Sequence, residues 1–87
     1  MSFKIQLEKF EGPLDLLLYF IRRDELDIYD IPISKITEDF INTINEWKRL
    51  NLVIAGEFIV MASTLMRIKA RMMIPRIDLD EEGENID

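Results

Sequence analysis

One long apolar stretch near the carboxyl end constrains what this chain of 87 residues can fold into. Residues 52–75 read LVIAGEFIVMASTLMRIKARMMIP and are rich in strong helix formers, with no proline before Pro75. We therefore predict a helix over residues 52–74. On a helical wheel its apolar arc spans roughly 200°, whereas a one-sided surface helix needs only about 100°. The pattern thus predicts a helix with two packing faces.

Two shorter helices are predicted upstream. The first begins at the break "EGP", residues 11–13, with Pro13 in its first turn, and ends at Arg22 and Arg23, which suit a helix C-terminus. At helical spacing, one apolar stripe is formed by Leu14, Leu17, Leu18 and Ile21. Two further apolar residues, Leu16 and Phe20, lie on the opposite side of the helix. This helix is also too apolar for a single packing face.

The second helix is predicted to follow "DIP", with Asp30 as N-cap and Pro32 in the first turn, and to run to about Leu50. It is an ordinary amphipathic helix, because its apolar residues fall on one narrow stripe. These residues are Ile33, Ile36, Phe40, Ile44 and Trp47.

A short strand is predicted at the N-terminus. Residues 3–8, "FKIQLE", alternate strictly between apolar and polar side chains, which is typical of a half-buried strand. A strand needs a partner, so we expect it to pair with residues 25–31 or with another chain. The predicted fold class is mainly α: a small three-helix domain with a short N-terminal β-strand and a long C-terminal helix.

The acidity of the chain is concentrated at its C-terminal end. The net charge is −6, and six of the 17 acidic residues lie within residues 78–87, "DLDEEGENID". Such a run is typical of a solvated linker, and an acidic docking segment is the alternative. We therefore predict one helical domain over residues 1–77 and the start of an acidic, disordered linker over residues 78–87.

Composition argues against catalysis. The chain has no Cys and no His, which removes disulfides, thiolate ligands, and the commonest metal ligand and general base. The carboxylates that might form a set fit helix-start, turn and cap positions better, namely Asp15, Asp24, Asp27 and Asp30. The three glycines are isolated, so no phosphate loop is predicted. We expect a protein that is not an enzyme and needs no cofactor or metal.

No targeting or membrane segment is predicted. The first ten residues lack a basic region followed by an apolar run, so no signal peptide is expected. The apolar part of the long stretch, residues 52–66, is too short for a bilayer and contains Glu57. A soluble, cytoplasmic protein with no membrane partner is expected.

One basic cluster occurs late in the chain, formed by Arg67, Lys69, Arg71 and Arg76. Cations near a helix C-terminus are favoured by the helix dipole, which is the simplest interpretation. A phosphate-contacting strip is less consistent with the acidic segment that follows. Pairing with acidic residues of a partner helix is the third possibility.

Two long motifs are similar to a known family. "FEGPLDLLLYFIRRDELDIYDIPISKITEDF" (10–40) and "GEFIVMASTLMRIKARMMIP" (56–75) resemble the N-terminal domain of the segregation and condensation protein A family, the bacterial kleisins. The resemblance covers residues 3 to about 76. The differences are conservative, such as Gly56 where Ala is expected.

The resemblance implies a function by contact. The family's N-terminal domain is helical and bundles against the neck coiled coil of an SMC protein, next to one ATPase head. A middle segment that binds the accessory protein ScpB and a C-terminal winged-helix domain follow, and neither matches these 87 residues. The complex closes around DNA, so this domain would meet DNA only indirectly, in the cytoplasm at the nucleoid.

The surplus apolar surface suggests where such a partner binds. Met61, Leu65, Ile68 and Met72 have the i, i+4, i+7 spacing of a helix anchor set, with Arg67 and Arg71 flanking it. The opposite face, expected to meet the domain's own core, comprises Ala55, Phe58, Ile59, Ala62 and Met66. The reverse assignment of the two faces stays open. So does a homodimer, formed by antiparallel pairing of the last helix or by strand addition, and so does a closer wrapping of the three helices.

Overall fold

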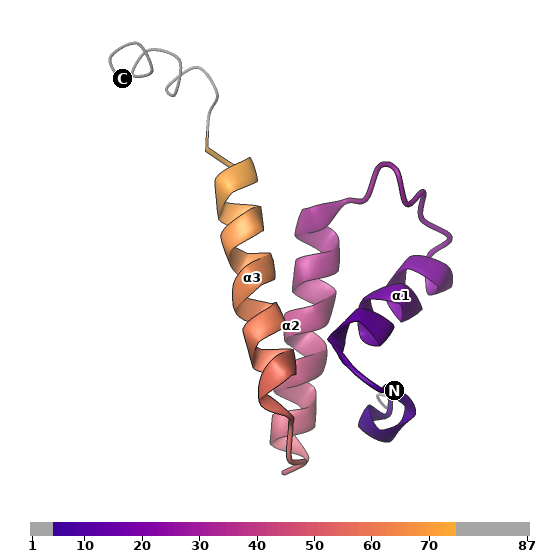
Figure 1. Ribbon diagram of the computed structural model, residues 1–87, viewed down its shortest axis with the longest axis vertical. Coiled ribbons are helices and arrows are strands. Elements are labelled where there is room, and N and C mark those ends of the chain that lie inside the picture. Colours follow the sequence, from indigo (N-terminus) through magenta and orange to yellow (C-terminus); the bar gives the residue numbers. More distant parts are fainter. Residues whose placement is uncertain (1–4, 75–87) are drawn as a thin grey trace.

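The computed structural model describes residues 5–74. Its elements are a 3-10 turn, η1 (Leu7–Lys9), and three helices, α1 (Pro13–Arg23), α2 (Ile33–Arg49) and α3 (Gly56–Met72). α2 and α3 lie side by side along most of their lengths, and α1 packs at an angle beside them (Figure 1). The prediction of a mainly α, three-helix domain is therefore confirmed for the helices.

The predicted N-terminal strand is wrong, since no strand occurs in residues 5–74. Lys9 N–H donates to the Gln6 carbonyl at 3.0 Å, which coils this segment into η1 instead. The other predicted strand is also folded into turns, with Leu26 N–H bonded to the Ile21 carbonyl at 2.9 Å. The Ile5 carbonyl is taken by the indole N–H of Trp47 at 2.9 Å. A side chain of α2 thus holds the segment that the alternating pattern assigned to a sheet.

The predicted start of α1 is confirmed and that of α2 is wrong. Pro13 is the first residue of α1, and the Asp15 carboxylate accepts a hydrogen bond from Glu11 N–H at 3.1 Å. α2 begins at Ile33 with Pro32 at the N-cap position. Asp30 is not the cap, because its N–H closes a turn onto the Asp27 carbonyl at 2.9 Å.

α3 begins later than residue 52. The α2 end is closed by Leu52 N–H, which bonds the Trp47 carbonyl at 3.0 Å, while Asn51 adopts a left-handed conformation with φ of 63°. The chain then extends to Ala55, the N-cap of α3. Pro75, the basic Arg76, the domain boundary at residue 77 and the acidic segment 78–87 lie outside the described residues.

The core lies where the three helices meet. Trp47 is fully buried at its centre, with the Phe58 ring edge-on at 5.8 Å and the Phe10 ring at 6.1 Å. α1 contributes Leu16 and Phe20, the two residues on the far side of its predicted stripe. The buried hydrophobic residues are Leu16, Phe20, Ile36, Phe40, Ile44, Trp47, Phe58, Ala62 and Leu65. The stripe residues Leu14 and Leu18 are instead exposed.

Candidate protein-interaction surface

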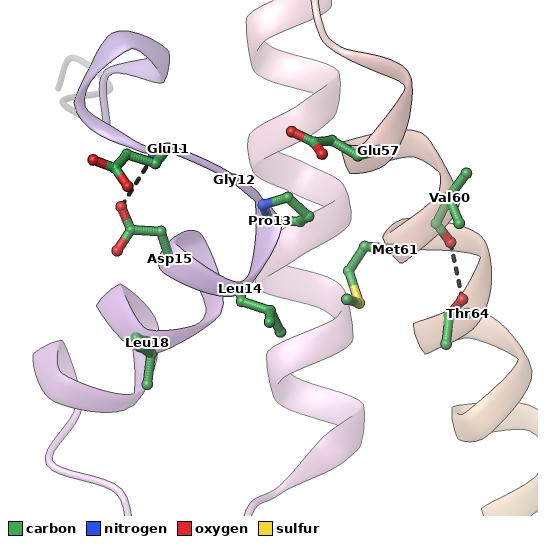
Figure 2. Close-up of a pocket in the computed structure, with 10 residues that line it drawn as sticks. All are labelled: Glu11, Gly12, Pro13, Leu14, Asp15, Leu18, Glu57, Val60, Met61 and Thr64. Carbon is green, nitrogen blue, oxygen red and sulfur yellow. Dashed lines mark hydrogen bonds between the residues drawn. The ribbon is translucent and has the colours of Figure 1, made fainter.

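An open groove of about 690 Å³ runs between the start of α1 and the first half of α3. Figure 2 shows Leu14 and Met61 extending from the two helices toward one another across it. The residues that line it are Glu11, Gly12, Pro13, Leu14, Asp15, Leu18, Glu57, Val60, Met61 and Thr64. Leu14 is 64% exposed and Val60 is 65% exposed, so the apolar lining is accessible to a partner.

Backbone geometry explains why these side chains meet. Leu14 and Leu18 are four residues apart on α1, and Val60 and Thr64 are four apart on α3, so each pair lies on one helical side. The Thr64 hydroxyl donates to the Val60 carbonyl at 3.0 Å. Glu57 in the first turn of α3 reaches toward the start of α1 near Gly12 (Figure 2). The groove therefore has apolar walls and an acidic end.

Beyond Thr64, where the lining of the groove ends, the predicted partner face occupies the second half of α3. Ile68 and Met72 are 38% and 64% exposed, and Arg67 and Arg71 are exposed beside them. Met61 is half-buried at the edge of the groove and packs against the core. These residues lie on the same side of α3 by helical spacing.

Leu65 has a different position from the other predicted anchors. It is 5% exposed and belongs to the core together with Phe58 and Ala62. Its side chain is therefore covered by the domain's own helices in this structure. A wheel cannot reveal this, because Leu65 lies on the border between the buried and exposed arcs.

Several exposed apolar residues were missed by the sequence reasoning. Ile59 and Met66 were expected in the core but are exposed, as are Val60, Met73 and Ile74. A second cleft of about 480 Å³ lies between α2 and α3 and is lined by Thr37, Glu38, Ile41, Asn42, Met66, Lys69, Ala70 and Met73. The sequence does indicate that some apolar residues of α3 are exposed, because its apolar arc of roughly 200° is wider than the arc of about 100° that one packing face needs.

The basic residues of α3 do not form one patch. Lys69 pairs with Glu38 of α2 at 3.5 Å, which ties the end of α3 to the neighbouring helix. Arg67 and Arg71 lie on the other side of α3 and line a shallow depression with Ile68. This division favours short-range pairing over a continuous phosphate-binding strip.

A separate charged cluster joins the end of α1 to the start of α2. Arg23 bonds Asp24 at 2.9 Å, and Lys35 reaches both Asp24 at 3.1 Å and Asp39 at 2.9 Å. Hydrogen bonds from Arg23 and then from Lys35 hold the pKa of the Asp24 carboxyl well below its usual range. The cluster links the C-terminal end of α1 to the first turns of α2 and lies away from the groove.

Residues 5–74 provide neither a metal-binding group of acidic side chains nor a membrane-spanning helix. Within residues 5–74, no group of three or more acidic side chains is placed to hold a metal ion. No helix in this part of the chain has both the length and the apolar character needed to cross a membrane.

The fold and the groove define a class of protein: a small helical domain with an exposed apolar face. A family model described as "Segregation and condensation protein ScpA" matches residues 20–86. The chain therefore belongs to the segregation and condensation protein A family.

Individual relatives agree with this assignment. Segregation and condensation protein A of Brevibacillus brevis is 51% identical over 76 residues, covering 87% of this chain and 30% of the relative. The protein of the same name from Lactobacillus gasseri is 51% identical over 80 residues, covering 92% and 32%. That of Myxococcus xanthus is 49% identical over 83 residues, covering 95% and 29%. The chain thus spans about a third of the length of these curated relatives.

Proposed function

We propose that this chain is the SMC-binding part of a bacterial kleisin, and that it serves chromosome condensation and segregation by holding the neck coiled coil of an SMC protein. Membership of the family supports the general role. The observation that carries the finer proposal is the exposure of Ile68 and Met72 in line with the α1–α3 groove. The role is one of contact and not of catalysis.

The geometry suits a helical partner. A helix bound in a groove is read by anchors three, four and seven residues apart, and Met61, Ile68 and Met72 provide the spacings of seven and four on α3. Burying a side chain such as Met72 contributes about 1.5–3 kcal/mol. Arg67 and Arg71 beside the anchors favour acidic residues on the neck helices and set their register. Leu65 supports this face from inside the core.

The remaining features of the complex follow from the family. In this proposal ScpB binds a segment beyond the helical domain, DNA is reached only through the assembled complex, and the site of action is the cytoplasm at the nucleoid. In this proposal the groove is left for the SMC neck.

Calorimetric titration of the chain with an SMC head that carries its neck coiled coil tests the proposal. Met72→Glu places a charge in the contact and is expected to weaken binding by about tenfold to a hundredfold. Val53→Glu is the matched control, because Val53 is 90% exposed in the loop before α3 and lies off the groove. Equal binding by Met72→Glu and wild type would reject this face. No heat with wild type at two well-separated temperatures, together with no complex in sedimentation, would reject the function, because apolar burial alone can have an enthalpy near zero at about 25 °C.

A further inference from the structure

The groove side of α3 changes charge along its length. We call its exposed and half-buried residues the groove strip: Glu57, Val60, Met61, Thr64, Arg67, Ile68 and Arg71. Spacings of three and four residues keep them on one side of the helix. Glu57 lies at the acidic end and Arg71 at the basic end, about 21 Å apart at the helical rise of 1.5 Å per residue. The segment between them is mainly apolar.

Four residues of the groove strip form two complementary pairs about Thr64. Glu57 and Arg71 are each seven residues from Thr64, and Val60 and Ile68 are each four residues from it. In these pairs an acid stands opposite a base, and an apolar side chain opposite an apolar one. The third pair sets Met61 opposite Arg67, whose aliphatic stem can lie along an apolar surface. Reversing the direction of the helix gives the complementary pattern. A surface with this property matches a second copy of itself across a two-fold axis.

We propose that two copies of the free chain pair through antiparallel α3 helices, with the two-fold axis at Thr64. Glu57 of each copy then faces Arg71 of the other, and Val60 faces Ile68. The basic, apolar second half of one α3 enters the acidic end of the groove on its partner. Both grooves are filled at once, so the contact closes as a dimer and does not propagate.

Local structure at the axis favours close approach. Thr64 is a small side chain, and its hydroxyl already donates to the Val60 carbonyl at 3.0 Å, so burial there leaves no donor without a partner. Helices pack at interaxial distances of about 8–10 Å, depending on the side chains at the contact, and a small residue at the crossing favours the shorter distances. Leu14 and Leu18 of α1, both exposed, add apolar area on each side of the axis.

Charge distinguishes a second copy from other occupants of the groove. An apolar partner that covered the whole groove strip would leave Glu57 and Arg71, at the two ends of the strip, without charged counterparts, which costs free energy. The second copy supplies both counterparts. The dimer also covers Met61 and Ile68, so it hides part of the face proposed to bind the SMC neck. Self-association would then prevent this apolar face from binding other proteins non-specifically until the SMC neck displaces the second copy.

The test is sedimentation equilibrium of the chain alone over a range of concentrations, which needs no SMC protein and is therefore independent of the proposed function. Wild type is expected to be dimeric. Glu57→Lys and Arg71→Glu each set like charges against one another twice, and each is expected to weaken the dimer about tenfold or more. An equimolar mixture of the two variants restores both ion pairs. In the mixed dimer the two substituted positions face one another with opposite charges, and the two unsubstituted positions keep the wild-type pair.

The mixture separates this proposal from a general effect of charge on folding or solubility. Recovery of the wild-type dimer mass in the mixture supports the antiparallel pairing. Lys48→Glu, an exposed change on α2, is the control and is expected to leave the dimer intact. A wild type that is monomeric throughout the series overturns the proposal. So does a mixture that associates no better than the two variants alone.

Discussion

Replacing threonine by valine is expected to change the stability of the domain in opposite directions at two equally buried threonines of α2. Thr37 and Thr43 are each 2% exposed. The Thr43 hydroxyl donates to the Asp39 carbonyl at 2.8 Å, whereas the Thr37 hydroxyl has no hydrogen-bond partner among the described residues. Valine has nearly the same shape as threonine, so exchange removes the hydroxyl with little change in packing. The two sites therefore isolate the hydrogen-bonding contribution.

Thr37→Val is expected to stabilise the domain. A buried polar group without a partner costs about 1–3 kcal/mol, and the lower end, about 1 kcal/mol, is expected to be regained. Thr43→Val removes a hydrogen bond worth about 0.5–1.5 kcal/mol and is expected to destabilise. For a domain of this size, about 1 kcal/mol moves the melting temperature by about 4–8 °C, so the two variants should differ by about 8–16 °C.

Thermal unfolding followed by circular dichroism in the far ultraviolet measures this difference, and urea unfolding checks the free energies. The matched pair controls for helix propensity, because both changes place valine in the same helix. A Thr37→Val domain that melts below wild type would refute the reasoning. It would mean that the Thr37 hydroxyl is bonded in solution and that the cleft beside it is hydrated.

Two further predictions concern stability. Trp47→Phe removes the indole hydrogen bond to the Ile5 carbonyl and leaves space at the centre of the core. A loss of about 2–4 kcal/mol in the free energy of unfolding is therefore expected in urea, with faster amide exchange at η1. Unchanged exchange at η1 would contradict a stabilising role of this contact. The Asp24 pKa is depressed by Arg23 and Lys35, so its contribution is present above the unfolded pKa of about 4 and is lost as pH falls below it. Asp24→Asn should make stability less dependent on pH between about 5 and 2, and an unchanged acid profile would remove this cluster as the cause.

Helix positions were predictable where single residues decide them. Pro13 sets the start of α1, and the cations Arg22 and Arg23 mark its end, as the structure has it. The start of α2 was misplaced because the Asp27 carboxylate accepts Tyr29 N–H at 2.9 Å and starts a turn ahead of the helix. A cap and a turn use the same residue types, so the sequence alone does not separate them.

The strand failed for a reason of tertiary structure. Alternation over residues 3–8 requires a pairing partner, and the segment 25–31 is instead shortened by turns, with Glu25 at a φ of 53°. The apolar faces were assigned only in part for a related reason. α1 is apolar on most sides, and whether Leu16 or Leu14 is buried depends on the angle at which α1 meets α2. That angle is not encoded in periodicity.

The groove of α1 and α3 joins the first and last helices of the domain, and this has a consequence for folding. α2 and α3 are neighbours in the chain and can pair early, because local contacts form faster than distant ones. The groove exists only after α1 has also docked. Anything bound there therefore favours the completely folded chain over states in which α1 has detached, and stabilises the whole domain by mass action. Binding in the groove and docking of α1 are thus linked equilibria, so each favours the other.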